Sequence, residues 1–219
     1  MSITNQLYLL DVSVLTDEKS FMTWYDRMDE TRKNKIDTFK PEKSKRLSLG
    51  AGILLYKALE EAGIKDYELC YKGREKPYIK GHEDVFFNIS HSGDLVALGI
   101  SDKEIGVDIE KCRVFKDTLI NYVYNDVDLS FASNLPIEWA YTRLWTLKES
   151  VMKHSGMGIA LVPKQIEIYS EAGEVRARTK DYDCEKLRFS SHIIGDYQLS
   201  VCSEYPQGAF SEVRFIDIT

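Results

Sequence analysis

Two carboxylates lie close together in the segment Gly106–Glu110, which reads GVDIE. Val107 and Ile109 alternate with them, which predicts a strand, and alternate residues of a strand point to one face. Asp108 and Glu110 are then about 7 Å apart on that face and repel each other unless a cation lies between them. A hard divalent ion such as Mg²⁺ takes oxygen ligands, including one or two protein carboxylates. The segment therefore indicates either a metal site or the solvated face of an edge strand.

A second charged pair lies in the segment Trp145–Lys153, which reads WTLKESVMK. On a helix, Glu149 and Lys153 are four residues apart and share one face. Such a carboxylate and ammonium can act on a reacting anion, or they can form an ordinary surface ion pair while Trp145 and Met152 are buried. The segment alone leaves both interpretations open.

A polar cluster ends the predicted strand Phe87–Gly93, which reads FNISHSG. Hydroxyl, imidazole and backbone N–H donors together suit a phosphate, because each of them can donate to an anionic oxygen. Ser90 and His91 make a poor nucleophile and base, since adjacent strand residues point to opposite faces. A turn held by local hydrogen bonds is the remaining interpretation.

Positive charge is concentrated in the first half of the chain. A polyanionic ligand such as a nucleotide would explain this density, and a solvated helix face is the ordinary alternative. The residues concerned are Arg32, Lys33, Lys35, Lys43, Lys45 and Arg46, followed by Arg74, Lys76 and Lys80.

The whole composition is that of an ordinary globular protein. The chain has 219 residues, is 43% hydrophobic and carries a net charge of −6, which argues against a general nucleic-acid binder. Its apolar runs are too short for a transmembrane helix, and its first residues lack the pattern of a signal peptide. The four cysteines form no CxxC pair and are expected to be reduced thiols. We therefore expect a cytoplasmic protein with no nucleic-acid or membrane partner.

Two long helices, over 44–62 and 136–154, are predicted from helical spacing and from the glycines that follow them. Short strands flank each helix, and weak self-similarity connects the two halves. Asp11 and Asp108 are 97 positions apart, as are Arg46 and Arg143, whereas Phe87 and Phe189 are 102 apart. The sequence thus predicts an α+β fold of two pseudo-symmetric lobes, 1–103 and 104–219, each with a small antiparallel sheet and a long packed helix.

Taken together, FNISHSG, GVDIE and WTLKESVMK resemble the signature of the 4′-phosphopantetheinyl transferases. The two-lobed length is similar to the subfamily that activates peptide synthetases, of the surfactin-synthetase-activating type, and unlike the short trimeric holo-acyl-carrier-protein synthases. The resemblance implies a monomer that transfers the phosphopantetheine arm of coenzyme A to a serine of an apo acyl- or peptidyl-carrier protein, with Mg²⁺, and releases adenosine 3′,5′-bisphosphate.

The resemblance also implies roles for individual residues. Asp108, Glu110 and Glu149 would hold Mg²⁺ in the second lobe, and Glu149 could help to deprotonate the serine. Lys148 and Lys153 would neutralise phosphate charge, with Lys153 and Asp108 counted as catalytic beside Glu149. In the first lobe, the coenzyme A contacts would be Arg32, Lys35 and Arg46 at the 3′-phosphate, Lys76 and Pro77 at the adenine, and Ser90 and His91 at the phosphates.

The sequence departs from the family pattern in two places. Glu75 stands where the family usually has a glycine before Lys76-Pro77, and the segment after GVDIE offers Asp126 or Asp128 where the family often has one acidic residue.

Two other functions use the same residues: a metal-dependent phosphohydrolase acting on a nucleotide or coenzyme A, and a non-catalytic protein that binds coenzyme A or a carrier.

Overall fold

The computed structural model describes residues 5–71 and 76–219. Glu75, the first departure from the family pattern, lies outside them. The elements of the first half are β1 (Gln6–Asp11), η1 (Val12–Thr16), α1 (Glu18–Tyr25), α2 (Glu30–Asp37), α3 (Glu42–Glu61), β2 (Leu69–Cys70), β3 (Tyr78–Ile79), β4 (Phe86–Ser92) and β5 (Leu95–Ser101).

The second half has the same general order of a strand, helices and a hairpin. Its elements are β6 (Ile105–Lys111), α4 (Asp117–Val123), α5 (Asp126–Phe131), α6 (Ile137–Ser155), η2 (Gly158–Ala160), η3 (Pro163–Gln165), β7 (Glu167–Glu171), β8 (Glu174–Arg178), β9 (Arg188–Ile194), β10 (Tyr197–Ser203) and β11 (Arg214–Phe215). The α+β class predicted from the sequence is confirmed.

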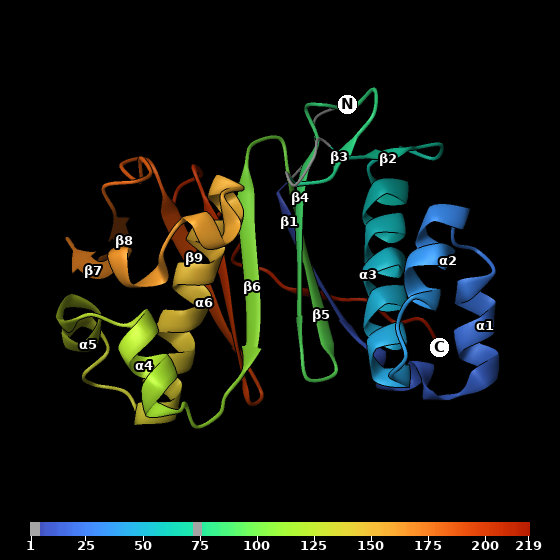
Figure 1. The fold of residues 1–219 in the computed structure, drawn as a ribbon. Coiled ribbons are helices and arrows are strands. Elements are labelled where there is room, and N and C mark those ends of the chain that lie inside the picture. The colour runs from blue at the N-terminus through green and yellow to red at the C-terminus, as the bar shows by residue number, and fades with distance from the viewer. Residues whose placement is uncertain (1–4, 72–75) are drawn as a thin grey trace.

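The elements stack in layers, with α1–α3 on one side, α4–α6 on the other and the strands of the two larger sheets between them (Figure 1). One sheet has the order β11-β1-β5-β4 and the other has the order β6-β10-β9. Apolar side chains of both sheets form a core between them, which includes Leu7, Ala97, Val107, Leu199 and Val201. Further apolar clusters lie beneath α3 and beneath α6.

The two halves share a strand topology. In the first half, β1 pairs with β5 of the β4–β5 hairpin, and in the second half β6 pairs with β10 of the β9–β10 hairpin. The strand exits are also alike, because Val12 N–H donates to the Asp94 carbonyl at 2.8 Å and Cys112 N–H donates to the Asp196 carbonyl at 2.7 Å. Val12 therefore corresponds to Cys112, a separation of 100 rather than the 97 read from the sequence. The boundary at 103/104 stays a prediction.

The long helices agree with their predicted spans within two residues, because their apolar stripes and ends are unambiguous. Gly156 adopts φ 70°, the left-handed conformation that commonly terminates a helix. Sequence reasoning missed α4, α5 and β8, which are short. Among the described residues, no helix has the length and apolarity that a membrane crossing requires.

Candidate active site

Asp108, Ser90 and Lys153 meet where β6, β4 and α6 come together. The Lys153 ammonium lies 2.7 Å from Asp108 Oδ1 and donates to Ser90 Oγ at 2.8 Å, and Ser90 Oγ donates to Asp108 Oδ1 at 2.7 Å. Asp108 and Ser90 are only 5% and 6% exposed. Motifs separated by up to 63 residues in sequence thus form one closed triangle of polar groups.

Close packing of α6 on β6 makes this meeting possible. A Cβ on Gly106 would lie 1.9 Å from the Ser150 carbonyl oxygen and 2.6 Å from the His154 nitrogen. Only glycine allows the helix backbone to approach the strand this closely. Gly106, the glycine of GVDIE, therefore lets α6 lie close enough to β6 for Lys153 to contact Asp108.

The second oxygen of Asp108 is buried and has no hydrogen-bond partner among the described residues. A buried carboxylate oxygen without a donor is costly, because it has lost water and gained nothing. Such an atom is suited to a ligand that carries positive charge or donates a proton.

Glu110 is the second carboxylate of the strand, and its Oε1 accepts from Arg113 Nε at 2.9 Å. The Arg113 guanidinium in turn lies over the Phe115 ring, 4.7 Å from its centroid. The repulsion expected between Asp108 and Glu110 is therefore reduced by two cations, Lys153 and Arg113. Sequence reasoning did not single out Arg113.

Glu149 is half-buried on α6, one helical turn before Lys153. Burial raises the pKa of its carboxyl group, and the negative charges of Asp108 and Glu110 raise it further, whereas Lys153 opposes them. The charges of Asp108 and Glu110 therefore act on Glu149. A carboxyl group with a raised pKa is a better proton acceptor than an ordinary one.

These acidic residues were predicted to bind Mg²⁺. Within the described ranges, no group of three His, Cys, Asp or Glu side chains is arranged to hold a metal ion. The donor chemistry nevertheless fits, because Mg²⁺ prefers carboxylate oxygens and Asp108 Oδ2 is an unpaired buried one. Magnesium binding by Asp108, Glu110 and Glu149 is therefore treated below as a proposal.

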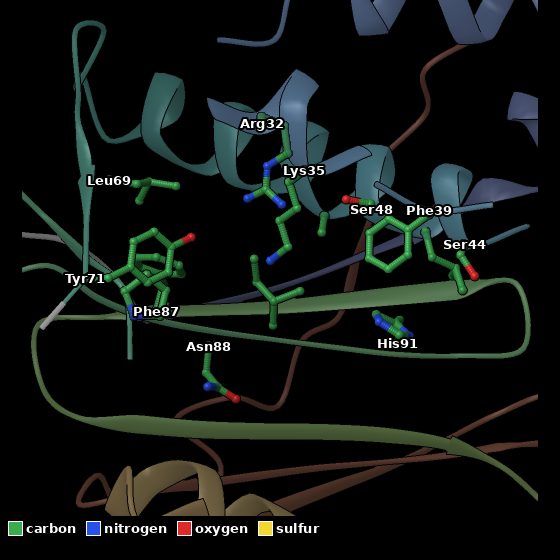
Figure 2. Close-up of a pocket in the computed structure, with 14 residues that line it drawn as sticks. Arg32, Lys35, Phe39, Ser44, Ser48, Leu69, Tyr71, Phe87, Asn88 and His91 are labelled. Atoms are coloured by element: carbon green, nitrogen blue, oxygen red, sulfur yellow. The ribbon is translucent and has the colours of Figure 1, made fainter. Parts of the chain in front are cut away.

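A pocket of about 380 Å³ opens between α2, α3 and β4. Figure 2 shows Arg32 and Lys35 reaching from α2 toward the strand that carries Phe87 and His91. Ser44, Ser48 and Phe39 add hydroxyl groups and a ring to the wall, and sequence reasoning had not selected them. The pocket thus combines cations, hydroxyl groups and apolar surface, as a phosphorylated nucleotide requires.

The pKa values of two basic side chains in this pocket, Lys35 and His91, are lowered. Burial lowers the pKa of Lys35, and the nearby Arg32 lowers it further. Partial burial also lowers the pKa of His91, with Lys153 as the next cause. Asp108 opposes the shift of the His91 pKa. His91 is therefore close enough to the triangle to respond to the charges of Lys153 and Asp108.

Of the other predicted coenzyme A contacts, Pro77 lies at the pocket, whereas Arg46 and Lys76 do not line it. Arg46 lies on α3 and is half-buried. Lys76 Nζ contacts Glu104 at 2.6 Å and donates to the carbonyls of Ile105 at 3.1 Å and His154 at 3.0 Å. Lys76 therefore ties the first half of the chain to β6 and α6 and faces a second hollow of about 500 Å³.

The prediction for Lys148 needs correction. Its side chain is 1% exposed, pairs with the fully buried Asp128 and donates to the carbonyls of Val123 at 2.8 Å and Pro163 at 3.0 Å. These groups use the three ammonium protons inside the lobe, so Lys148 does not face the pocket. Asp126 is exposed in the first turn of α5.

Comparison with known proteins bears on the second half of the chain in particular. Residues 104–202 match the family model of the 4′-phosphopantetheinyl transferase superfamily. A 4′-phosphopantetheinyl transferase of Bacillus subtilis is 26% identical over 182 residues, which are 75% of this chain and 76% of that protein.

Two other relatives are matched over shorter segments. The 4′-phosphopantetheinyl transferase psf-1 of Bacillus pumilus is 26% identical over 63% of this chain, and AcpT of Salmonella typhimurium is 34% identical over 53%. The chain spans 61% and 62% of their lengths. The resemblance to the 4′-phosphopantetheinyl transferase superfamily that the three motifs predict is thus confirmed, and the segment matched to the family model holds Asp108, Glu110, Glu149 and Lys153.

Proposed function

We propose that this chain transfers the 4′-phosphopantetheine arm of coenzyme A to a serine of an apo acyl- or peptidyl-carrier protein. The observation that carries the proposal is the triangle of Asp108, Ser90 and Lys153, with the unpaired Asp108 Oδ2, beside a cationic pocket. The similarity to transferases of this name supports the same reaction.

In the proposed reaction, the serine oxygen of the carrier attacks the phosphorus that bears pantetheine. The bond from that phosphorus to the bridging oxygen breaks, and adenosine 3′,5′-bisphosphate leaves. Glu149 accepts the serine proton, which its raised pKa favours. Lys153 stabilises the negative charge that develops on the phosphoryl oxygens.

The cationic pocket would hold the nucleotide end of coenzyme A. Arg32 and Lys35 suit the 3′-phosphate, because they are the cations that line the wall, and His91 lies toward the reacting groups. We propose Mg²⁺ as the cofactor, held by Asp108, Glu110 and Glu149; when bound, it neutralises charge on the pyrophosphate. A single chain supplies both the pocket and the carboxylates, which supports action as a monomer.

Intact-mass analysis of candidate apo carrier proteins tests the proposal directly. Incubation with the enzyme, coenzyme A and Mg²⁺ should add one phosphopantetheine group to each carrier molecule. A carrier whose acceptor serine is replaced by alanine should gain nothing. Release of adenosine 3′,5′-bisphosphate without any carrier, at a rate equal to transfer, would instead establish the phosphohydrolase.

A further inference from the structure

Two sheet edges face each other at the centre of the molecule. Strand β4 ends the order β11-β1-β5-β4, and β6 begins the order β6-β10-β9. An edge strand presents backbone N–H and C=O groups that need partners, particularly where the strand is buried. Along β6, the residues from Ile105 to Ile109 are buried, so the partners of this edge matter.

Side chains of β4 supply two of these partners. Asn88 Oδ1 accepts from Val107 N–H at 2.8 Å, and Ser92 Oγ accepts from Lys111 N–H at 3.1 Å. Both contacts join residues that are 19 positions apart in sequence. Because the two contacts are four residues apart on each strand, β4 and β6 run parallel and in a single register.

The triangle of the candidate active site lies between these two contacts. Ser90 is midway between Asn88 and Ser92 on β4, and its hydroxyl donates to Asp108. The three polar side chains alternate with Phe87, Ile89 and His91, which line the pocket. Figure 2 shows Asn88 pointing away from Arg32 and Lys35. Phe87, Ile89 and His91 thus face the pocket, whereas Asn88, Ser90 and Ser92 contact β6, and Asn88 also lies at the edge of the pocket.

We propose that Asn88 and Ser92 are positioning residues, which hold the edge of β6 through its backbone and so fix Asp108 against Ser90 and Lys153. Neither side chain needs to touch the reacting atoms. The proposal rests on the proposed transfer reaction for its kinetic consequence, whereas its structural consequence can be measured without that reaction.

The physical reason is the sensitivity of catalysis to position. If the Val107 and Lys111 amides lose their acceptors, β6 stays paired with β10, but its edge toward β4 loses two contacts and Asp108 can shift relative to Ser90. A misplacement of about 1 Å in a reacting group can cost on the order of a hundredfold in rate. Ser92 is not among the residues that line the pocket, so binding of the nucleotide should change little in Ser92→Ala.

The test compares Ser92→Ala, the double variant Asn88→Ala/Ser92→Ala and the control Ser101→Ala. Ser101 is another strand serine whose hydroxyl accepts a backbone N–H, from Lys103 at 3.2 Å, but it lies on β5. Ser101 is fully buried, whereas Ser92 is half-buried, and the Ser101 hydroxyl also donates to Asn5 Oδ1 at 2.9 Å. We expect kcat to fall a few-fold in Ser92→Ala and about tenfold or more in the double variant. KM for coenzyme A should stay within about twofold in Ser92→Ala, and Ser92→Thr should keep the wild-type kcat.

A second measurement does not depend on activity. Nuclear magnetic resonance should show faster amide exchange at Lys111 in Ser92→Ala and a changed Asp108 carboxyl carbon shift, with neither change in Ser101→Ala. Wild-type kcat and wild-type exchange in the double variant would overturn the positioning role. If the wild-type protein modifies no carrier, the proposed function fails, and the exchange and carbon-shift comparison still decides whether Asn88 and Ser92 hold β6 and Asp108.

Discussion

Replacing Lys148 with methionine should destabilise the protein strongly while leaving coenzyme A binding intact. Lys148 and Asp128 form an ion pair in which both side chains are at most 1% exposed. Removal of one partner leaves a charge buried without compensation, which typically costs about 3–5 kcal/mol of unfolding free energy. Melting temperature falls by about 2–4 °C per kcal/mol in chains of this size, so we expect a decrease of roughly 6–20 °C.

A change at Asp128, the other partner of the ion pair, tests whether the buried charge causes the loss of stability. Asp128 Oδ1 accepts from Ile168 N–H at 2.8 Å, and Oδ2 accepts from Asn125 N–H at 2.9 Å in the cap of α5. Asparagine carries no charge and keeps one acceptor oxygen, although its NH₂ group replaces the other acceptor, so the rescue should be partial. The double variant Lys148→Met/Asp128→Asn should therefore be more stable than Lys148→Met alone, because no uncompensated carboxylate is left in the core.

Urea and thermal unfolding, followed by circular dichroism, measure the stability of the variants. Calorimetric titration with coenzyme A, well below the melting temperature, should give an affinity within about twofold of wild type for Lys148→Met. Lys57→Met is the control, because the Lys57–Glu60 pair is partly exposed to solvent on α3 and its loss should change the free energy of unfolding far less than the loss of Lys148 does. A stability loss under 1 kcal/mol, or a tenfold loss of coenzyme A affinity in folded Lys148→Met, would refute the assignment.

Three further predictions follow from the site. Arg32→Ala should weaken coenzyme A about ten- to hundredfold but 3′-dephospho-coenzyme A much less, as measured by calorimetric titration; equal losses would contradict a 3′-phosphate contact. Because Glu149 must be deprotonated to act as base and its pKa is raised, kcat should fall as pH decreases through that raised pKa, and Glu149→Gln should be inactive at every pH. Gly106→Ala should cost at least roughly 1–3 kcal/mol in urea unfolding and abolish transfer, because its Cβ overlaps the Ser150 carbonyl; wild-type activity would show that α6 can move away.

Much of the fold can be predicted because its signals are local. The apolar periodicity and terminal signals of the helices over 42–61 and 137–155 are contained within each segment. The Phe87/Phe189 separation correctly pairs the β4–β5 and β9–β10 hairpins, which share a topology. The separation of 97 for the first strands was wrong because single matching residues do not fix strand register.

Lys148 is buried because it lies on the apolar stripe of α6, although its charge suggests an exposed position. Leu144, Lys148 and Val151 lie on one helical stripe, and the flanking leucine and valine are fully buried. Lysine at such a position must find a carboxylate, and Asn125-x-x-Asp128 provides one through a capping box. The box is readable from sequence, but its contact with Lys148 is not, because the two segments meet only after α4, α5 and η3 have packed against α6.

The site itself depends on contacts that no single motif contains. GVDIE predicts where two carboxylates point, yet it does not show that Lys153 and Arg113 will neutralise them. FNISHSG contains two interleaved patterns, and sequence reasoning interpreted only its phosphate-binding potential. The side chains of Asn88, Ser90 and Ser92 also contact another strand, β6. Polar residues at every second position of an edge strand are consistent with a partner strand as well as with a bound anion, and the position of β6 shows that the partner strand is present.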